Sequence, residues 1–367
     1  MKVKEDLGFR KNILFFFSTT KIGGTETNFL GLAEDLNYYG CDIFVLTAKN
    51  DGPLFEKFKS FAKDISTIEL KKINQFSNIL QYRDFISRNN IDIVFNCGLK
   101  VEIFSRLFSH IFKVNKVISN IRSTDDWRRF YHTLLDRLTQ FGVDIWVSNS
   151  KAGLNTFSKR EKIDMNRALV IYNYVKEFNP TKSKVCRNNE QLLITIGILA
   201  NLKEGKGFED LIEIAKELYS LGTNNFLFLI GGMDYSNGRI PGKLKNSIYS
   251  KHFKLIGFIN DKQDFFDQID IFFLPTYWEG FPTSILEAMN HGKPVVSTKV
   301  GGIPEMIEHN YNGYLSEPGN VKLFAHHIQE LSNSNELYNY FVDNSFKILK
   351  EKFIRPIVLK KWINILK

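Results

Sequence analysis

The sequence predicts an α/β protein with two domains, each built on a parallel sheet that carries helices on both faces. In each half of the chain, short apolar runs alternate with helical patterns, which is typical of a parallel sheet. A polar segment around Pro180 separates the two series, and 367 residues suffice for two cores. The predicted strands are residues 12–17, 42–47, 91–95, 116–121 and 144–147, then 192–198, 226–230, 254–256, 271–274 and 295–297.

We place the N-terminal domain at residues 1–175, a linker at 176–190 and the C-terminal domain at 191–345. Residues 346–367 are predicted to be helical, with a break before Pro356. In doubly wound domains, ligands bind outside the carboxyl ends of the strands. The functional residues are therefore expected in the loops that follow the strands.

Composition excludes several classes of protein. Hydrophobic residues make up 43% of the chain, as in soluble globular proteins, and no apolar run approaches the ~20 residues that span a bilayer. Residues 1–11 are charged and lack the core of a signal peptide, so we expect a cytoplasmic protein. The widely spaced Cys41, Cys97 and Cys186 indicate reduced thiols rather than a disulfide framework or a zinc site.

The net charge of +9 is compatible with nucleic-acid binding, with an anionic membrane surface, or with a Lys-rich genome. No recognition-helix or RNA-binding signature accompanies the charge, so we predict no nucleic-acid partner. Residues 101–112 and 127–138 combine basic and aromatic side chains on predicted helices, which suits peripheral binding to the inner face of the plasma membrane. Amphipathic helices packed on their sheet explain the same apolar faces, and the sequence leaves both explanations open.

The most informative segment follows the predicted strand 271–274. The chain breaks at Gly280 and Pro282 and restarts as a helix over residues 283–291. A loop that opens onto a helix gathers unpaired backbone N–H groups and the positive end of the helix dipole at one place, which favours phosphate binding.

Two carboxylates bracket this segment, Glu279 in the loop and Glu287 about one turn into the helix. Carboxylates repel phosphate, so they are better suited to accept hydrogen bonds from sugar hydroxyls on either side of a diphosphate. This combination indicates a nucleotide-sugar site. The alternative is a solvated loop glutamate and a glutamate on the exposed face of an ordinary helix.

The chain resembles the family 4 retaining glycosyltransferases of GT-B architecture, also called glycosyl transferases group 1. The resemblance begins with Glu279 and Glu287, separated by seven residues, and continues in the family's order through residues 294–297, 301–305 and 312–315. It implies two Rossmann-like domains that face a central cleft, with the helix of residues 346–367 crossing back to the N-terminal domain. Within the family, the chain is similar to bacterial surface-polysaccharide glycosyltransferases.

The resemblance also implies roles for individual residues. Lys206 stabilises the leaving diphosphate, Glu279 orients the donor sugar and Glu287 holds the ribose hydroxyls. Asn201 departs from the family, which usually has Arg there, and Lys203 is a candidate for the missing charge. The implied donor-binding residues are Gly23, Gly24, Asn201, Lys206, Gly257, Phe258, Glu279, Gly280, Phe281, Pro282, Thr283, Ser284 and Glu287. For Gly23 and Gly24, a simple turn before a helix is the alternative.

The acceptor side differs from the family's usual His-Asp pair. At that place the chain reads Asn120 to Trp127, which includes Arg122 and Asp125. We expect Arg122 to contact the donor phosphate or the acceptor, and Asp125 to position the acceptor hydroxyl. A cap on the following helix is an equally good explanation of Asp125.

The resulting hypothesis is a retaining hexosyl- or N-acetylhexosaminyl-transferase that uses a nucleotide-diphosphate sugar as co-substrate and no other cofactor. No Asp-x-Asp motif is present, so no metal site is expected. The resemblance suggests a glycan acceptor, lipid-linked, in the synthesis of capsule, lipopolysaccharide or related surface polysaccharide. Two alternatives stay open, a non-catalytic GT-B partner subunit and a sugar-nucleotide epimerase of the same architecture.

Overall fold

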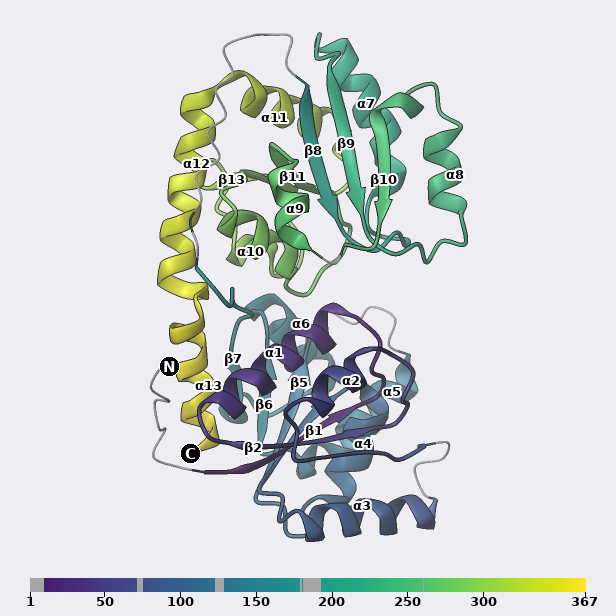
Figure 1. Ribbon diagram of the computed structural model, residues 1–367, viewed down its shortest axis with the longest axis vertical. Helices are drawn as coiled ribbons and strands as arrows, with labels where there is room; N and C mark the ends of the chain where they lie inside the picture. Colours follow the sequence, from purple (N-terminus) through teal and green to yellow (C-terminus); the bar gives the residue numbers. More distant parts are fainter. Residues whose placement is uncertain (1–9, 71–74, 123–128, 179, 181–192, 260) are drawn as a thin grey trace. The chain divides into compact units, whose positions relative to one another are not determined.

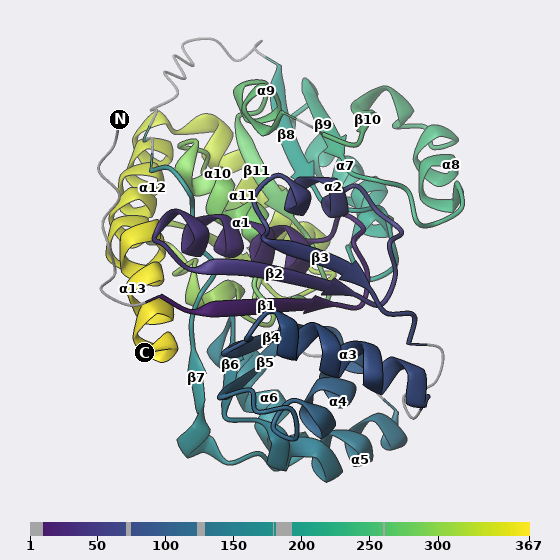
Figure 2. The ribbon, with the colours of Figure 1, turned by 60° about the horizontal axis from the view of Figure 1, so that its bottom comes forward.

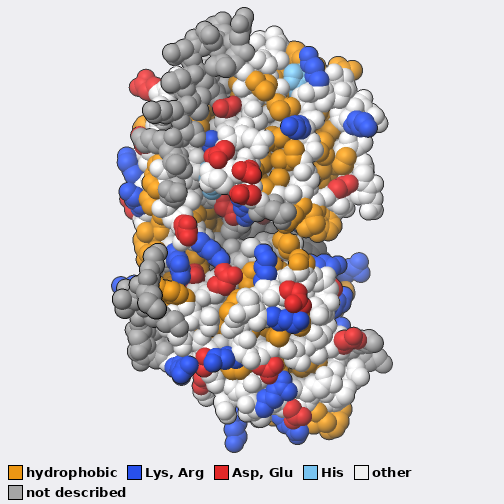
Figure 3. Space-filling view, viewed as in Figure 1, with side chains coloured by type: hydrophobic (Ala, Val, Ile, Leu, Met, Phe, Trp, Pro, Cys, Tyr) orange, Lys and Arg blue, Asp and Glu red, His pale blue; other side chains and the backbone are white. Residues whose placement is uncertain are grey.

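The chain divides into two compact units, described separately (Figure 1 and, as a space-filling view, Figure 3). The first contains Met1–Ile171 and Lys360–Lys367, and the second contains Tyr172–Leu359. The computed structural model describes all residues except 1–9, 71–74, 123–128, 179, 181–192 and 260. Most of the predicted linker thus lies outside the described residues.

The first unit is a doubly wound parallel sheet with the strand order β3-β2-β1-β4-β5-β6-β7. The order reverses between β1 and β4, which is the switch point where such sheets bind ligands. Its strands are β1 (Asn12–Phe17), β2 (Asp42–Thr47), β3 (Asp64–Thr67), β4 (Ile93–Cys97), β5 (Lys116–Ile121), β6 (Ile145–Ser148) and β7 (Ala168–Val170). Its helices are α1 (Gly24–Tyr38), α2 (Leu54–Lys59), α3 (Phe76–Arg88), α4 (Leu99–Phe108), α5 (Phe130–Thr139) and α6 (Lys151–Glu161), with short 3-10 turns at Gln140–Gly142 and Met165–Arg167.

The phenylalanine-rich β1 shows why this sheet needs helices on both faces. Successive side chains of a strand point to opposite faces. Phe15 packs on Phe29 of α1, whereas Phe16 packs on Tyr82 of α3 and on Phe104 of α4. Figure 2 shows α1 and α2 on one side of the strands β1 to β3, and α3 and α4 on the other. A central strand that is apolar on both faces is therefore fully buried.

The second unit repeats this architecture with the strand order β10-β9-β8-β11-β12-β13. The order reverses between β8 and β11, and all paired strands run parallel. Its strands are β8 (Ile194–Leu199), β9 (Phe226–Gly231), β10 (Phe253–Gly257), β11 (Ile271–Leu274), β12 (Val295–Thr298) and β13 (Gly313–Ser316). Its α-helices are α7 (Leu211–Ser220), α8 (Arg239–Lys245), α9 (Lys262–Asp267), α10 (Thr283–Asn290), α11 (Val321–Asn333) and α12 (Asn335–Ile348); 3-10 turns lie at Phe208–Asp210, Ser250–His252 and Ile303–Glu305.

The boundary between the units falls just before the predicted linker 176–190. Tyr172 stacks on Phe281, and Val175 forms a backbone bridge with Ile354, so the chain joins the second unit's core directly after β7. At the other end, α12 runs into a π-helical turn (Leu349–Phe353) and then α13 (Arg355–Leu366). The last turns of α13 belong to the first unit, where Trp362 packs on Phe95.

The two helices considered for membrane contact differ in packing. In α4 the apolar face is buried, because Val101 and Phe104 lie in the core of the first unit. In α5 the apolar residues are exposed instead. The explanation that both helices pack their apolar faces on the sheet is confirmed for α4 and is wrong for α5.

Candidate functional site

Three loops of the second unit meet beside the N-terminus of α10. The backbone N–H of Tyr277, in the loop after β11, donates to the carbonyl of Gly205 in the loop after β8, at 2.8 Å. The N–H of Gly302, in the loop after β12, donates to the carbonyl of Gly280 at 2.8 Å. Because each loop leaves the carboxyl end of its strand, these bonds assemble one site at one edge of the sheet.

Two glycines make this close packing of backbone possible. Gly207 has φ +73°, and a Cβ atom there would lie 2.0 Å from the carbonyl oxygen of Pro275. Gly301 has φ +52°, and its Cβ atom would lie 1.8 Å from the carbonyl oxygen of Glu279. Both positions favour glycine through their left-handed backbone and through the missing side chain.

Lys206 and Glu279 form an ion pair in this assembly. The Nζ of Lys206 donates to Oε1 of Glu279, although 73 residues separate them. Lys206 is only 9% exposed, which is unusual for a lysine. The structure thus brings together the two residues that the sequence placed on the diphosphate and on the donor sugar.

Lys203 lies near this pair. Partial burial lowers the pKa of the Lys203 ammonium below its ordinary value, and the charge of Lys206 lowers it further, while Glu279 opposes the change. Because Lys206 and Glu279 both act on it electrostatically, Lys203 is a second basic side chain beside this pair. Lys203 could therefore supply the charge expected at Asn201.

Asn201 itself has a structural role. Its Oδ1 accepts a hydrogen bond from the backbone N–H of Met233, at 3.1 Å, and so ties the loop after β8 to the loop after β9. Nearby, the carbonyl of Gly257 accepts from the N–H of Gly232, at 2.7 Å, and Phe258 is exposed. Gly257 and Phe258, two of the implied donor-binding residues, therefore border the same strand ends as Asn201.

Glu287, in the second turn of α10, pairs with a residue that sequence reasoning missed. The Nζ of Lys262, the first residue of α9, donates to Oε1 of Glu287. The pair fixes the direction of the carboxylate and places a second charged group beside it. The only sequence signal for Lys262 was its position at the start of a helix after the loop that contains Gly257 and Phe258.

The structure places the side chain of Phe281 in the core, not at a ligand-facing surface. It is 4% exposed and packs on Tyr172, with ring centroids 5.1 Å apart. Only its backbone can contact a donor. The next residue, Pro282, caps α10 in an extended conformation, so the N–H groups of Thr283 and Ser284 fall in the first helical turn, where they have no partner within the helix.

In the first unit, Gly23 and Gly24 begin α1 as predicted, but a carboxylate already lies there. A Cβ atom on Gly23 would lie 2.3 Å from Oε2 of Glu26, so the Glu26 side chain folds back over the helix end. Burial raises the pKa of this carboxyl, while its backbone hydrogen bond partly offsets the rise. A phosphate that binds at this helix end would have to displace the Glu26 side chain, unless the Glu26 carboxyl is protonated.

Arg122 follows β5, and its guanidinium lies over the ring of Phe29 in α1, 4.3 Å from the ring centroid. Its Nη2 donates to Oδ1 of Asn120 at 3.1 Å. Burial lowers the pKa of Arg122 to about 10, so the residue is still a cation at neutral pH. Asp125, the other residue predicted on the acceptor side, lies outside the described residues.

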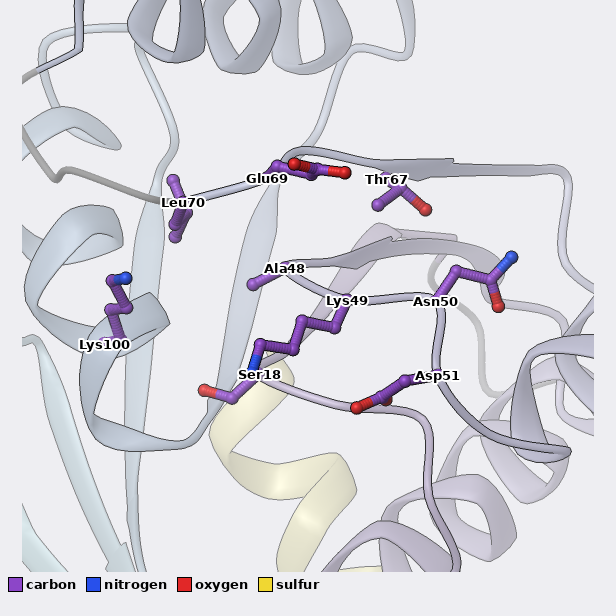
Figure 4. A pocket seen from close by; sticks show the side chains of 9 residues that line it. All are labelled: Ser18, Ala48, Lys49, Asn50, Asp51, Thr67, Glu69, Leu70 and Lys100. Carbon is purple, nitrogen blue, oxygen red and sulfur yellow. The ribbon is translucent and has the colours of Figure 1, made fainter.

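A cavity of about 640 Å³ opens in the first unit at the carboxyl ends of β1, β2 and β3 (Figure 4). Sequence reasoning missed it, because its residues form no motif and share only their position after strands. One wall carries Asp51, whose Oδ1 accepts hydrogen bonds from the Thr19 hydroxyl and the Thr20 N–H. The lining residues are Ser18, Ala48, Lys49, Asn50, Asp51, Thr67, Glu69, Leu70 and Lys100.

Residues 182–348 match the family model described as glycosyl transferases group 1. An uncharacterized glycosyltransferase of Haemophilus influenzae is 24% identical over 365 residues, which cover 96% of this chain and 98% of the relative. The capsular polysaccharide biosynthesis glycosyltransferase CapH of Staphylococcus aureus is 22% identical over 349 residues, which cover 92% of this chain and 95% of CapH.

The crystal structure of Anabaena HepE in complex with UDP superimposes on this chain with a TM-score of 0.82 at 18% identity, covering 97% of this chain and 99% of HepE. A second HepE structure, in complex with UDP-glucose, gives a TM-score of 0.81 over the same shares of the two chains. These likenesses show that the two doubly wound units form the GT-B fold. Among the helices in the described part of the chain, none has the length and apolar character needed to cross a bilayer.

Proposed function

We propose that the chain, whose residues 182–348 match the glycosyl transferases group 1, is a retaining, metal-independent transferase that moves a sugar from a nucleotide-diphosphate sugar to a glycan acceptor. The observation that carries the proposal is the contact between Lys206 and Glu279 beside the N-terminus of α10. A cation, a helix N-terminus and a carboxylate within one assembly can serve a diphosphate and the sugar attached to it.

In the proposed donor complex, the diphosphate lies at the N-terminus of α10 and takes Lys206 as its counter-ion. Glu279 then loses its contact with Lys206 and accepts a hydrogen bond from a hydroxyl of the donor sugar instead. The backbone N–H of Phe281 helps to orient that sugar. Glu287, directed by Lys262, accepts hydrogen bonds from the ribose hydroxyls. The UDP and UDP-glucose held by Anabaena HepE make UDP-sugars the first donors to test.

The transfer breaks the bond between the anomeric carbon and the phosphate oxygen. The acceptor hydroxyl oxygen forms the new bond on the same face of the sugar, and its proton goes to the leaving phosphate. Negative charge grows on the nucleoside diphosphate as it leaves, and Lys206 with the dipole of α10 stabilises that charge. Because these fixed positive groups supply the stabilisation, the proposed reaction requires no metal.

The cavity of Figure 4 is our candidate for the glycan acceptor, with Arg122 and Asp125 as further acceptor-side candidates. Its volume of about 640 Å³ is within the usual range for small-molecule sites. Its wall offers both cations (Lys49, Lys100) and carboxylates (Asp51, Glu69), groups that bind sugar hydroxyls. Relatives named for capsular polysaccharide biosynthesis support a role in surface polysaccharide synthesis, and we propose a lipid-linked intermediate of that synthesis as the acceptor.

Turnover of Glu279→Gln tests the proposal. We expect the transfer rate with UDP-sugars to fall by at least about 100-fold, while the melting temperature falls only by about 4–8 °C, as expected when Lys206 loses its carboxylate partner. A transfer rate within about threefold of the wild type would remove Glu279 from the mechanism. If the wild-type chain binds UDP but transfers to no glycan acceptor, it is a non-catalytic partner subunit instead.

A further inference from the structure

The helix α5 packs on its unit with its polar side inward. Asp136, only 1% exposed, accepts a hydrogen bond from Nη1 of the buried Arg106. Arg106 also donates through Nη2 to Glu102 and through Nε to Ser119, the latter at 3.0 Å. Its guanidinium lies 4.6 Å from the ring centroid of Trp146. This buried charge network fixes which side of α5 faces the unit.

The opposite side of α5 is apolar and faces solvent. Phe130 is 79% exposed and Leu138 is 62% exposed, and Leu134 between them is exposed as well. Residues four apart share one face of a helix, so these three side chains form a continuous row. Tyr131, Leu135 and the following Phe141 are also exposed and extend this apolar face. We call these six residues the α5 face.

Basic residues border the α5 face. The neighbouring helix α6 touches α5 through a hydrogen bond from Nη2 of Arg137 to the carbonyl of Arg160. Between residues 129 and 162 the chain has six basic and three acidic residues, and two of the acids, Asp136 and Glu161, are buried. Lys159 and Lys162 are exposed.

We propose that the α5 face docks on an anionic lipid bilayer, inserting its apolar row at the interface while Lys159 and Lys162 contact the headgroups. An exposed apolar row bordered by basic residues is the arrangement of interfacial helices, and its charge complements an anionic surface. This inference rests on the proposed function in one respect, that a lipid-linked acceptor gives the docking its purpose.

A second copy of the chain fits the α5 face less well. The helix has ten residues and is about 15 Å long, so one face of it covers about 150 Å². A stable dimer buries about 800 Å² on each partner. Two α5 faces would also bring their basic borders together, which costs free energy.

Co-sedimentation with vesicles tests the proposal. We expect the full chain to sediment with phosphatidylcholine vesicles that contain about 30% phosphatidylglycerol, and not with pure phosphatidylcholine vesicles. Raising the salt from about 0.05 M to about 0.5 M should weaken binding, because it shortens the range of the electrostatic attraction. Absence of sedimentation with anionic vesicles at low salt would overturn the proposal.

Three variants assign the binding to the α5 face. The triple variant Phe130→Ser, Leu134→Ser, Leu138→Ser should reduce vesicle binding at least about tenfold, because less apolar surface inserts. The matched control Ile248→Ser, Leu323→Ser, Tyr340→Ser removes three exposed apolar side chains of the second unit and should bind as the wild type does. Lys159→Glu with Lys162→Glu should also lose binding, and it serves if the first triple variant does not fold.

Three outcomes contradict the proposal: wild-type binding by the α5 variant, an equal loss in the control, or light scattering that shows a dimer which the α5 variant dissociates. The melting-temperature shift caused by UDP, measured without vesicles, keeps this test separate from the proposed function. A chain that responds to UDP but ignores anionic vesicles contradicts only the membrane proposal. A chain that binds vesicles but no nucleotide contradicts only the donor site.

Discussion

Replacing Lys206 by methionine separates two roles of this residue, its ion pair with Glu279 and its proposed stabilisation of the leaving diphosphate. In the wild type, only 11% of the Lys206 side chain and 17% of the Glu279 side chain are exposed. Lys206→Met keeps much of the side-chain volume but leaves the Glu279 carboxylate largely buried without its cation. Breaking a fully buried pair costs about 3–5 kcal/mol, and the remaining solvent access reduces this, so we expect a loss of about 2 kcal/mol. For a unit of this size, that loss lowers the melting temperature by about 4–8 °C.

The same change should lower the transfer rate far more than stability explains. Loss of one fixed group that stabilises developing charge lowers kcat by about 100- to 1,000-fold. The double variant Lys206→Met, Glu279→Gln removes the unpaired carboxylate, so its melting temperature should return toward that of the wild type while its activity stays low. Differential scanning fluorimetry and initial rates with a UDP-sugar measure both quantities.

If Lys206→Met lowers kcat by less than about tenfold, the cation does not stabilise the leaving group. If the double variant is as unstable as the single one, the lost stability does not come from the unpaired carboxylate. Lys216→Met provides the control, since Lys216 lies on the exposed side of α7 and pairs with Glu213 of the same helix.

Three further predictions concern other parts of the molecule. Gly301→Ala should destabilise the second unit by about 1–3 kcal/mol and weaken UDP binding, because its Cβ atom displaces the Glu279 backbone; unchanged urea unfolding would contradict this. Burial alone would raise the pKa of Asp51, but hydrogen bonds from Thr19 and Thr20 and nearby lysines lower it, so its contribution to stability is present above about pH 4 and is lost as the pH falls through the lowered pKa. The melting-temperature difference between wild type and Asp51→Asn should therefore shrink on acidification, and a constant difference would contradict the assignment. Lys100→Ala should raise the acceptor KM at least about threefold without changing UDP affinity, and an unchanged KM would remove the cavity from the acceptor site.

The sequence predicted those strands of the sheets that consist of continuous apolar runs. Residues 12–17 and 271–274 match β1 and β11, because a strand buried on both faces needs apolar side chains throughout. Three strands were missed. The residues of β3 and β7 are half-buried and mixed in character, whereas β13 is buried but has only four residues, Gly313 and Ser316 among them. Periodicity does not detect a strand whose two faces are neither clearly apolar nor clearly polar.

Within the candidate site, the family resemblance pointed to Lys206, Glu279 and Glu287 as candidates but did not give the direction of every side chain. Phe281 was also predicted to bind the donor, yet its ring packs in the core against Tyr172. The partner of Glu287 was also invisible, because Lys262 belongs to another helix and to no motif. Contacts between residues far apart in sequence decide such details, and local patterns do not record them.

The orientation of α5 also depends on a contact between residues far apart in the sequence. Its sequence is amphipathic, and the usual expectation is that the apolar side faces the sheet. The buried Arg106 reverses this, because it requires the carboxylate of Asp136, 30 residues later, on the inner side of the helix. A single long-range ion pair thus determines which face of the helix is exposed.

Titration calorimetry of UDP into the wild-type chain and into Glu287→Ala tests the proposed nucleotide-sugar site most directly. The wild type should bind UDP, and the variant, which loses the carboxylate for the ribose hydroxyls, should bind it at least about tenfold more weakly. No heat of binding with UDP or with any other nucleoside diphosphate would contradict the claim that residues 275–290 form a nucleotide-sugar site. Equal affinity in the two proteins would show that the nucleotide binds elsewhere.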